Sequence, residues 1–176
     1  AGYQFSSANS INIGRLVPQV VYYVYAYAKL LENEEIQAGE EINVTVPTGN
    51  FGNILSAFYA KNMGLPVAKL ICASNENKVL YDFFETGKYD KNREFILTSS
   101  PSMDILISSN LERLIYWAAG NDAKRLHVQD LPMFVAHRTR MKFIHPDPVP
   151  PGSGRCPAPR SKYRRSGFCP SDAPTR

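Results

Sequence analysis

The residues best suited to chemistry form a short glycine-containing run at positions 48–53. It reads Thr-Gly-Asn-Phe-Gly-Asn and lies between an alternating, β-branched segment (42–46) and a segment with helical spacing (54–63). A parallel strand delivers such a run to the carboxyl edge of a sheet, where open α/β folds bind ligands. The helix after the run directs its unsatisfied N–H groups and the positive end of its dipole at the same place. The run therefore predicts a cradle for an anion such as a phosphate ester.

The same run also has a plainer interpretation, in which Gly49 and Gly52 only shape the connection from strand to helix. The helix dipole supplies roughly 0.3–1 kcal/mol, so several amide hydrogen bonds would have to do most of the holding. Neither a Walker lysine nor the G-x-G-x-x-G dinucleotide pattern occurs at this run, which argues against nucleotide binding.

A second group of polar residues precedes the longest apolar stretch. Asn9 and Ser10 stand just before it, and Arg15 lies about one and a half turns into a helix that begins near Ser10. Two short polar side chains and a guanidinium fork would suit a second phosphate group. The alternative is a capping serine with a solvated arginine.

Elements that position these residues are indicated by the periodicity. The apolar stretch 11–31 contains four tyrosines and three polar interruptions, so it does not fit a membrane span, which needs about 20 apolar residues. It predicts instead a helix that is buried on most sides and capped by Ser10 or Asn12. Strands are predicted at 42–46, 67–73 and 95–98, and helices at 54–63, 79–85 and 110–119, with Asn110 as a cap. The order strand, loop, helix, strand implies a parallel α/β sheet.

Composition divides the chain into two parts. Residues 1–120 hold 9 Lys+Arg and 12 Asp+Glu, whereas residues 121–176 hold 11 and 4, and the net charges of −3 and +7 give the overall +4. Nine of the 13 prolines also lie in the second part. From residue 146 onward no periodicity persists, and such a composition buries too little apolar surface to offset chain entropy. We therefore expect an α/β unit at 1–125 and a disordered tail at 126–176.

The tail allows several interpretations. Its clustered cations beside Tyr163 are typical of a nucleic-acid arm or of a merely solvated charge run, and we expect no nucleic-acid partner. The cations are Arg155, Arg160, Lys162, Arg164 and Arg165. A third hypothesis is translation in a shifted reading frame, which often yields such a segment. The three cysteines, Cys72, Cys156 and Cys169, form no CxxC pair and no metal-ligand spacing, so we expect no metal site. Few cysteines and no visible secretory signal favour a cytoplasmic setting. Cys72 ends an apolar strand, so we expect it in the core.

Several runs together resemble segments of threonine synthases in the expected order, over about residues 1–124. They are SANSINIGRLVPQVVYYVYAY, VPTGNFGNILSAFYAKNMGLPV, ICASNEN, FFETGKYD and SPSMDILISSNLERL. The match is closest to the bacterial and fungal type whose loop reads GNFGN. The resemblance implies the central, incomplete portion of a fold-type II pyridoxal-phosphate enzyme, similar to the tryptophan synthase β subunit.

Chemically, the resemblance implies conversion of O-phosphohomoserine and water into threonine and phosphate, the last step of threonine biosynthesis. By motif position, the cofactor phosphate would be held by Gly49, Asn50, Phe51, Gly52 and Asn53. The substrate phosphate would be held by Asn9, Ser10 and Arg15.

The phenylalanine-lysine-aspartate type motif that carries the Schiff-base lysine of the family does not occur in the chain. No catalytic residue is therefore assigned, and we expect the chain to be inactive alone. The alternatives are a phosphohomoserine phospho-lyase of the threonine-synthase-like group, and a non-catalytic remnant or interaction module.

Overall fold

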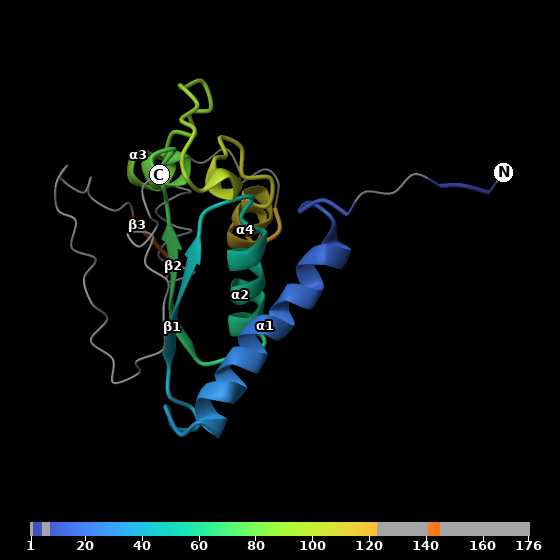
Figure 1. The fold of residues 1–176 in the computed structure, drawn as a ribbon, viewed down its shortest axis with the longest axis vertical. Coiled ribbons are helices and arrows are strands. Elements are labelled where there is room, and N and C mark those ends of the chain that lie inside the picture. The colour runs from blue at the N-terminus through green and yellow to red at the C-terminus, as the bar shows by residue number, and fades with distance from the viewer. Residues whose placement is uncertain (1, 5–7, 123–140, 145–176) are drawn as a thin grey trace, which may run out of the picture.

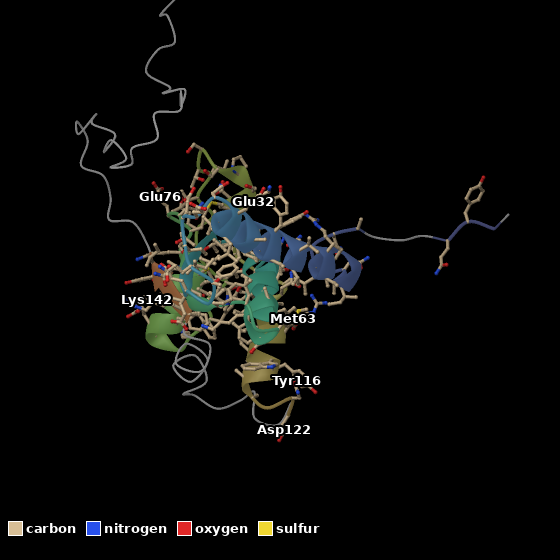
Figure 2. The ribbon with its side chains drawn as sticks, turned by 90° about the horizontal axis from the view of Figure 1, so that it is seen from below. Glu32, Met63, Glu76, Tyr116, Asp122 and Lys142 are labelled. Atoms are coloured by element: carbon tan, nitrogen blue, oxygen red, sulfur yellow. The ribbon has the colours of Figure 1, made fainter. Side chains whose placement is uncertain are left out.

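The computed structural model describes residues 2–4, 8–122 and 141–144, and in these ranges helices pack on a parallel sheet of three strands. The strands are β1 (Ile42–Pro47), β2 (Val67–Ala73) and β3 (Met141–Ile144), in the order β1-β2-β3. The helices are α1 (Ile13–Glu32), α2 (Gly52–Asn62), α3 (Val79–Thr86), the short 3-10 helix η1 (Pro101–Met103) and α4 (Leu111–Ala118). Figure 1 shows α2 between the sheet and α1. Figure 2 shows the same arrangement from below, with Lys142 marking the sheet and Tyr116 marking α4.

The β1-α2-β2 unit confirms the predicted parallel α/β class. Val44 pairs with Leu70 and Val46 with Cys72 in a parallel register. Parallel neighbours need a crossover connection, and α2 supplies it. The predicted bounds of these elements and of α3 agree with the structure to within two residues.

The core is centred on α2, which is covered on both sides. Its residues from Ile54 to Phe58 are all buried because the sheet lies on one side of the helix and α1 on the other. The Phe58 ring meets the Trp117 ring of α4 edge-on at 4.7 Å between centroids. The buried Ser56 hydroxyl donates to Leu16 O and Gly52 O, both at 3.0 Å, and so joins the first turn of α2 to α1. The head of α2 is therefore held from two directions.

Helix α1 is less buried than its sequence predicts. Only Leu16 and Tyr27 are buried, whereas Val17 and Val21 are 57% and 62% exposed. The prediction of burial on most sides is wrong for the described residues, because α2 packs against one face of α1 and no other described element covers the opposite face. The predicted cap is confirmed at Asn12, whose side chain accepts from Gly14 N at 2.8 Å. No described helix combines the length and apolarity needed to span a membrane.

The predicted strand at 95–98 does not form. The side chain of Asn77 takes the place of a neighbouring strand, since it accepts from Ile96 N at 3.0 Å and donates to Ile96 O at 2.7 Å. Thr98 N donates to the Asp104 carboxylate at 2.9 Å in the same way. The backbone groups of Ile96 and Thr98 are thus satisfied by side chains, and the β-propensity of Phe95-Ile96-Leu97-Thr98 does not lead to strand pairing.

Four residues of the predicted disordered tail are ordered. Met141–Ile144 form β3, which pairs in parallel with residues 70–73 of β2, and Ile144 O accepts from Ser74 N at 2.8 Å. The Phe143 ring stacks on Phe84 with centroids 3.7 Å apart, so the alternating apolar residues of this stretch do face partners. The prediction of disorder is wrong for these residues. The boundary at 125/126 and the remainder of 126–176 lie outside the described residues.

Candidate anion-binding site

The glycine-containing run lies where the sequence predicts it, between the carboxyl end of β1 and the first turn of α2. Thr48 continues the sheet pairing, because its N–H and its hydroxyl both donate to Ala73 O, at 2.6 and 2.5 Å. The same hydroxyl lies 3.3 Å from the Cys72 sulfur, and burial raises the pKa of this thiol to about 11. Cys72 is therefore a neutral core residue, as expected, and the start of the run is fixed to the sheet.

The turn into α2 depends on a phenylalanine in the left-handed region, not on a glycine. Phe51 occupies the N-cap position with φ 64 and ψ 3 and is only 3% exposed. Neither Gly49 nor Gly52 has a positive φ, so the left-handed position of this turn falls on Phe51. A non-glycine residue in this region costs on the order of 1–2 kcal/mol. Burial of its ring and the bonds on either side of it must hold it there.

The carbonyl groups of the run are occupied, while its N–H groups are not. Gly49 O accepts from the Ser108 hydroxyl at 2.7 Å, and Asn50 O accepts from both the backbone N and the side-chain Nδ2 of Asn110, at 3.1 and 2.9 Å. The N–H groups from Gly49 to Asn53 donate to no residue in the described part of the chain. The last of these, from Gly52 and Asn53, belong to the head of α2, where unpaired N–H groups favour an anion.

One partly open pocket, of about 280 Å³, brings most of the predicted site residues together. All five predicted cofactor-phosphate residues line it, and so do Ser10 and Arg15 from the start of α1. Its lining comprises Ser10, Arg15, Leu16, Gln19, Tyr22, Pro47, Gly49, Asn50, Phe51, Gly52, Asn53, Ile54 and Ser102. Arg15 is the only charged residue among them. Because the donors are amides, hydroxyls and a guanidinium without a carboxylate, the pocket suits an anion.

Asn9 is the predicted site residue that does not line the pocket. Its side-chain oxygen accepts from Ile11 N at 3.1 Å and shapes the turn before α1. Arg15 donates from Nη1 to Ala8 O at 3.2 Å, and the side chain is exposed. Arg15 thus bends back over the turn as the sequence suggests, towards a backbone carbonyl next to Asn9.

Three residues near the pocket were not singled out by the sequence. The Tyr23 hydroxyl bonds both the backbone oxygen of Asn53, at 3.1 Å, and its side-chain oxygen. Burial raises the Tyr23 pKa to about 12, so the hydroxyl remains a donor at neutral pH. The Gln19 Oε1 atom is buried and finds no partner among the described residues. Ser102 reaches the pocket from η1. The sequence signal for Gln19 and Tyr23 is their helical spacing, which places both on the Arg15 side of α1. Ser102 has no comparable signal.

Ser108 and Asn110 support the site from behind. Both occur in the stretch preceding α4, where the sequence suggests only a helix cap at Asn110. Asn110 does occupy the N-cap position, yet its side chain makes no capping bond. It donates instead to the backbone oxygens of Asn50 and Ser10. Nothing local in the sequence signals those partners, because they lie 60 and 100 residues away.

The chain resembles known proteins over most of its length. No protein-family model matches the chain. Threonine synthase-like 1 of Mus musculus is 56% identical over 124 residues, which cover 70% of this chain and 17% of that protein. Threonine synthase of Saccharomyces cerevisiae is 41% identical over 117 residues, covering 66% of this chain and 22% of that protein. The chain therefore spans only about a fifth of the length of these relatives.

Solved structures give the same result. Threonine synthase from Brucella melitensis, described as PLP bound, matches with a TM-score of 0.69 and 39% identity over 80% of this chain and 32% of that one. Yeast threonine synthase matches with a TM-score of 0.62 and 31% identity over 78% and 30%. The expected fold class, a portion of a fold-type II pyridoxal-phosphate enzyme, is confirmed by these matches.

Proposed function

Since the matched part of the chain belongs to the threonine synthase family, we propose that its pocket is the phosphate-binding portion of a pyridoxal-phosphate-dependent lyase site. The observation that carries the proposal is the meeting of two segments in one pocket. One supplies the unpaired N–H groups of residues 49–53 at the head of α2, and the other supplies Ser10 and Arg15. A reaction with both a phosphorylated cofactor and a phosphorylated substrate needs two such anion sites.

In this proposal the run 49–53 binds the phosphate of pyridoxal phosphate, mainly through backbone amides. The bound cofactor supplies an electron sink for carbon acids. Arg15 and Ser10 bind the phosphate of O-phosphohomoserine, and the guanidinium stabilises the charge that grows on that phosphate as it leaves. Holding both phosphates fixes the reacting carbon relative to the cofactor. Threonine and inorganic phosphate are the proposed products.

A second candidate function is phosphohomoserine phospho-lyase activity. One observation favours it: the threonine synthase-like 1 relatives are 56% identical to this chain, whereas the threonine synthases are 40–44% identical. The two reactions share both phosphate sites and diverge after the phosphate has left. Water addition gives threonine, whereas release of the eliminated product gives a keto acid and ammonia.

Binding to the 176-residue chain tests the phosphate-site proposal directly. We expect pyridoxal phosphate to bind about tenfold or more tightly than pyridoxal, because only the former has the anion that the amides of 49–53 recognise. Pyridoxal closes to an internal hemiacetal and reacts less with surface lysines than pyridoxal phosphate does, so the comparison is repeated with pyridoxine phosphate and pyridoxine, which carry no aldehyde. Equal affinities in equilibrium dialysis would contradict the proposal.

Turnover by the chain alone is expected to be absent, because the lysine-bearing motif of the family does not occur in its 176 residues. Phosphate release from O-phosphohomoserine in the presence of pyridoxal phosphate measures this. Release above the protein-free rate would contradict the expectation. Its co-product, threonine or a keto acid, would then separate the two candidate reactions.

A further inference from the structure

Asn110 joins the two phosphate-binding segments through a single side chain. It is fully buried, with 0% exposure, and its Nδ2 donates to Asn50 O and to Ser10 O, both at 2.9 Å. Asn50 belongs to the run at the head of α2, and Ser10 precedes α1. These segments are 40 residues apart in the chain, and each contributes one wall of the pocket.

The orientation of the Asn110 amide is set by its partners. Its Oδ1 accepts a short hydrogen bond from Nη1 of Arg113, which can only donate. Its Nδ2 must therefore face the two carbonyl oxygens, which can only accept. Arg113 strengthens the same junction, because its Nη2 donates to Ile11 O at 2.7 Å. Both N–H donors of the Asn110 side-chain amide are thus used to hold backbone carbonyls.

Holding a carbonyl also aims the next N–H group. Every described peptide bond is trans, so the C=O of one residue and the N–H of the next point in opposite directions. With Asn50 O fixed on Asn110, the N–H of Phe51 points away from Asn110. Phe51 lines the pocket and Asn110 does not, so this direction suits an anion in the pocket. Ser108 orients the preceding peptide in the same way through Gly49 O.

We infer that Asn110 is a positioning residue for both phosphate sites, which aims the Phe51 N–H at the cofactor phosphate and fixes the Ser10 segment against it. This inference rests on the proposed function. It also accounts for the left-handed backbone at Phe51, because a conformation of this cost persists where the surroundings over-determine it. The two bonds from Asn110 to Asn50 O supply that constraint.

The sharpest test replaces the amide by a carboxylate of the same shape. Asn110→Asp keeps the volume but sets a charged oxygen against two carbonyl oxygens. Binding of pyridoxal phosphate is measured by equilibrium dialysis, and binding of inorganic phosphate by calorimetry with pyridoxal phosphate at saturation. We expect both affinities to fall about tenfold or more. Ser108→Ala, which frees only Gly49 O, should lower pyridoxal phosphate affinity about threefold and leave the second site unchanged.

Asn62→Asp is the matched control. It makes the same chemical change near the end of α2, where the side chain donates to Phe58 O in its own helix and to no other residue in the described part of the chain. Both affinities should stay within about twofold of those of the unmodified chain. Asn110→Asp binding both ligands as tightly as the unmodified chain would overturn the inference and leave the proposed function intact, as would loss confined to one ligand. An unmodified chain that binds neither ligand overturns the proposed function, and this inference with it.

A measurement on the unmodified chain keeps the test independent of whether Asn110→Asp folds. In nuclear magnetic resonance spectra, inorganic phosphate added to the chain saturated with pyridoxal phosphate should shift the Asn110 side-chain amide signal together with the Phe51 N–H signal. The Asn62 side-chain amide signal should not move. An Asn110 signal that is unchanged while phosphate binds would overturn the coupling.

Discussion

The two walls of the pocket are held in different ways. The run at the head of α2 comes directly after a strand of the sheet, its carbonyls are occupied by Ser108 and Asn110, and Phe51 is almost fully buried. The segment before α1 is exposed from Asn9 to Arg15 except for Ser10, which is half-buried. It is joined to the rest chiefly by Leu16 packing and by the bonds from α4. The wall formed by the run 49–53 is held by buried contacts, whereas the wall formed by Ser10 and Arg15 is more exposed and is held at a few points.

This difference fits the chemistry proposed for each wall. A cofactor stays bound through many turnovers, so its phosphate site gains from a preformed cradle of amides. A substrate phosphate has to arrive and leave in every cycle, so an exposed arginine on a tethered segment suits it. The contacts that hold the Ser10 and Arg15 segment are few, and each is made by a named residue. The comparison can therefore be tested one contact at a time.

The largest expected effect comes from removing the Leu16 side chain, through which α1 packs against the core. Leu16 is 1% exposed and lies in the core cluster, so Leu16→Ala leaves a cavity between α1 and α2 and should lower the free energy of unfolding by about 2–5 kcal/mol. Val21→Ala, on the exposed face of the same helix, should change it by less than about 0.5 kcal/mol. Chemical denaturation of the three chains measures both. Equal losses would show that α1 is not tied through Leu16.

The next effect separates binding from stability. Arg15→Ala removes the only charge in the pocket lining, so affinity for the second phosphate should fall about 10–100-fold with little change in unfolding. Arg15→Lys should restore part of it, since an ammonium group keeps the charge but loses the planar fork. Lys29→Ala removes a similar charge near the other end of α1 and is the control. Calorimetry with inorganic phosphate measures all four chains, and an unaffected affinity in Arg15→Ala would contradict the assignment.

The sequence predicts the run at the head of α2 better than the environment of α1. The β1-α2-β2 unit is local, so alternation, helical spacing and glycine stops locate it to within two residues. The positive φ at Phe51 is not predictable in this way, because no local pattern marks it and the constraint comes from Asn110. Burial of α1 is overestimated for a related reason: hydrophobic periodicity reports which residues favour burial, not which element covers them.

Long-range polar contacts are the other part that sequence patterns miss. Asn77 and Asp104 satisfy the backbone of 96–98 with side chains, which removes a strand that β-propensity predicts. Met-Lys-Phe-Ile likewise lies in a segment whose composition predicts disorder, although those four residues join β2. In both cases a partner distant in sequence decides the local structure.

The smallest effect concerns the Tyr23 hydroxyl, which joins α1 to Asn53 in the run at the head of α2. The Tyr23 pKa is raised from 10.0 to about 12 by burial, so the folded chain favours the neutral hydroxyl that bonds Asn53. A raised folded-state pKa contributes stability that is complete below pH 10 and is lost as the pH rises to about 12. Because the side chain is partly exposed, the loss should be on the order of 1 kcal/mol.

Tyr23→Phe should remove that part of the pH dependence, whereas the same substitution at the exposed Tyr25 should retain it. Burial also raises the pKa of Cys72 and Tyr89, so only the difference between the two variants isolates Tyr23. Denaturation midpoints between pH 9 and 12 measure this difference. Parallel curves for both variants would mean that the Tyr23 hydroxyl does not hold α1 against Asn53, and α1 would then depend on Leu16 packing, the Ser56 hydroxyl and α4.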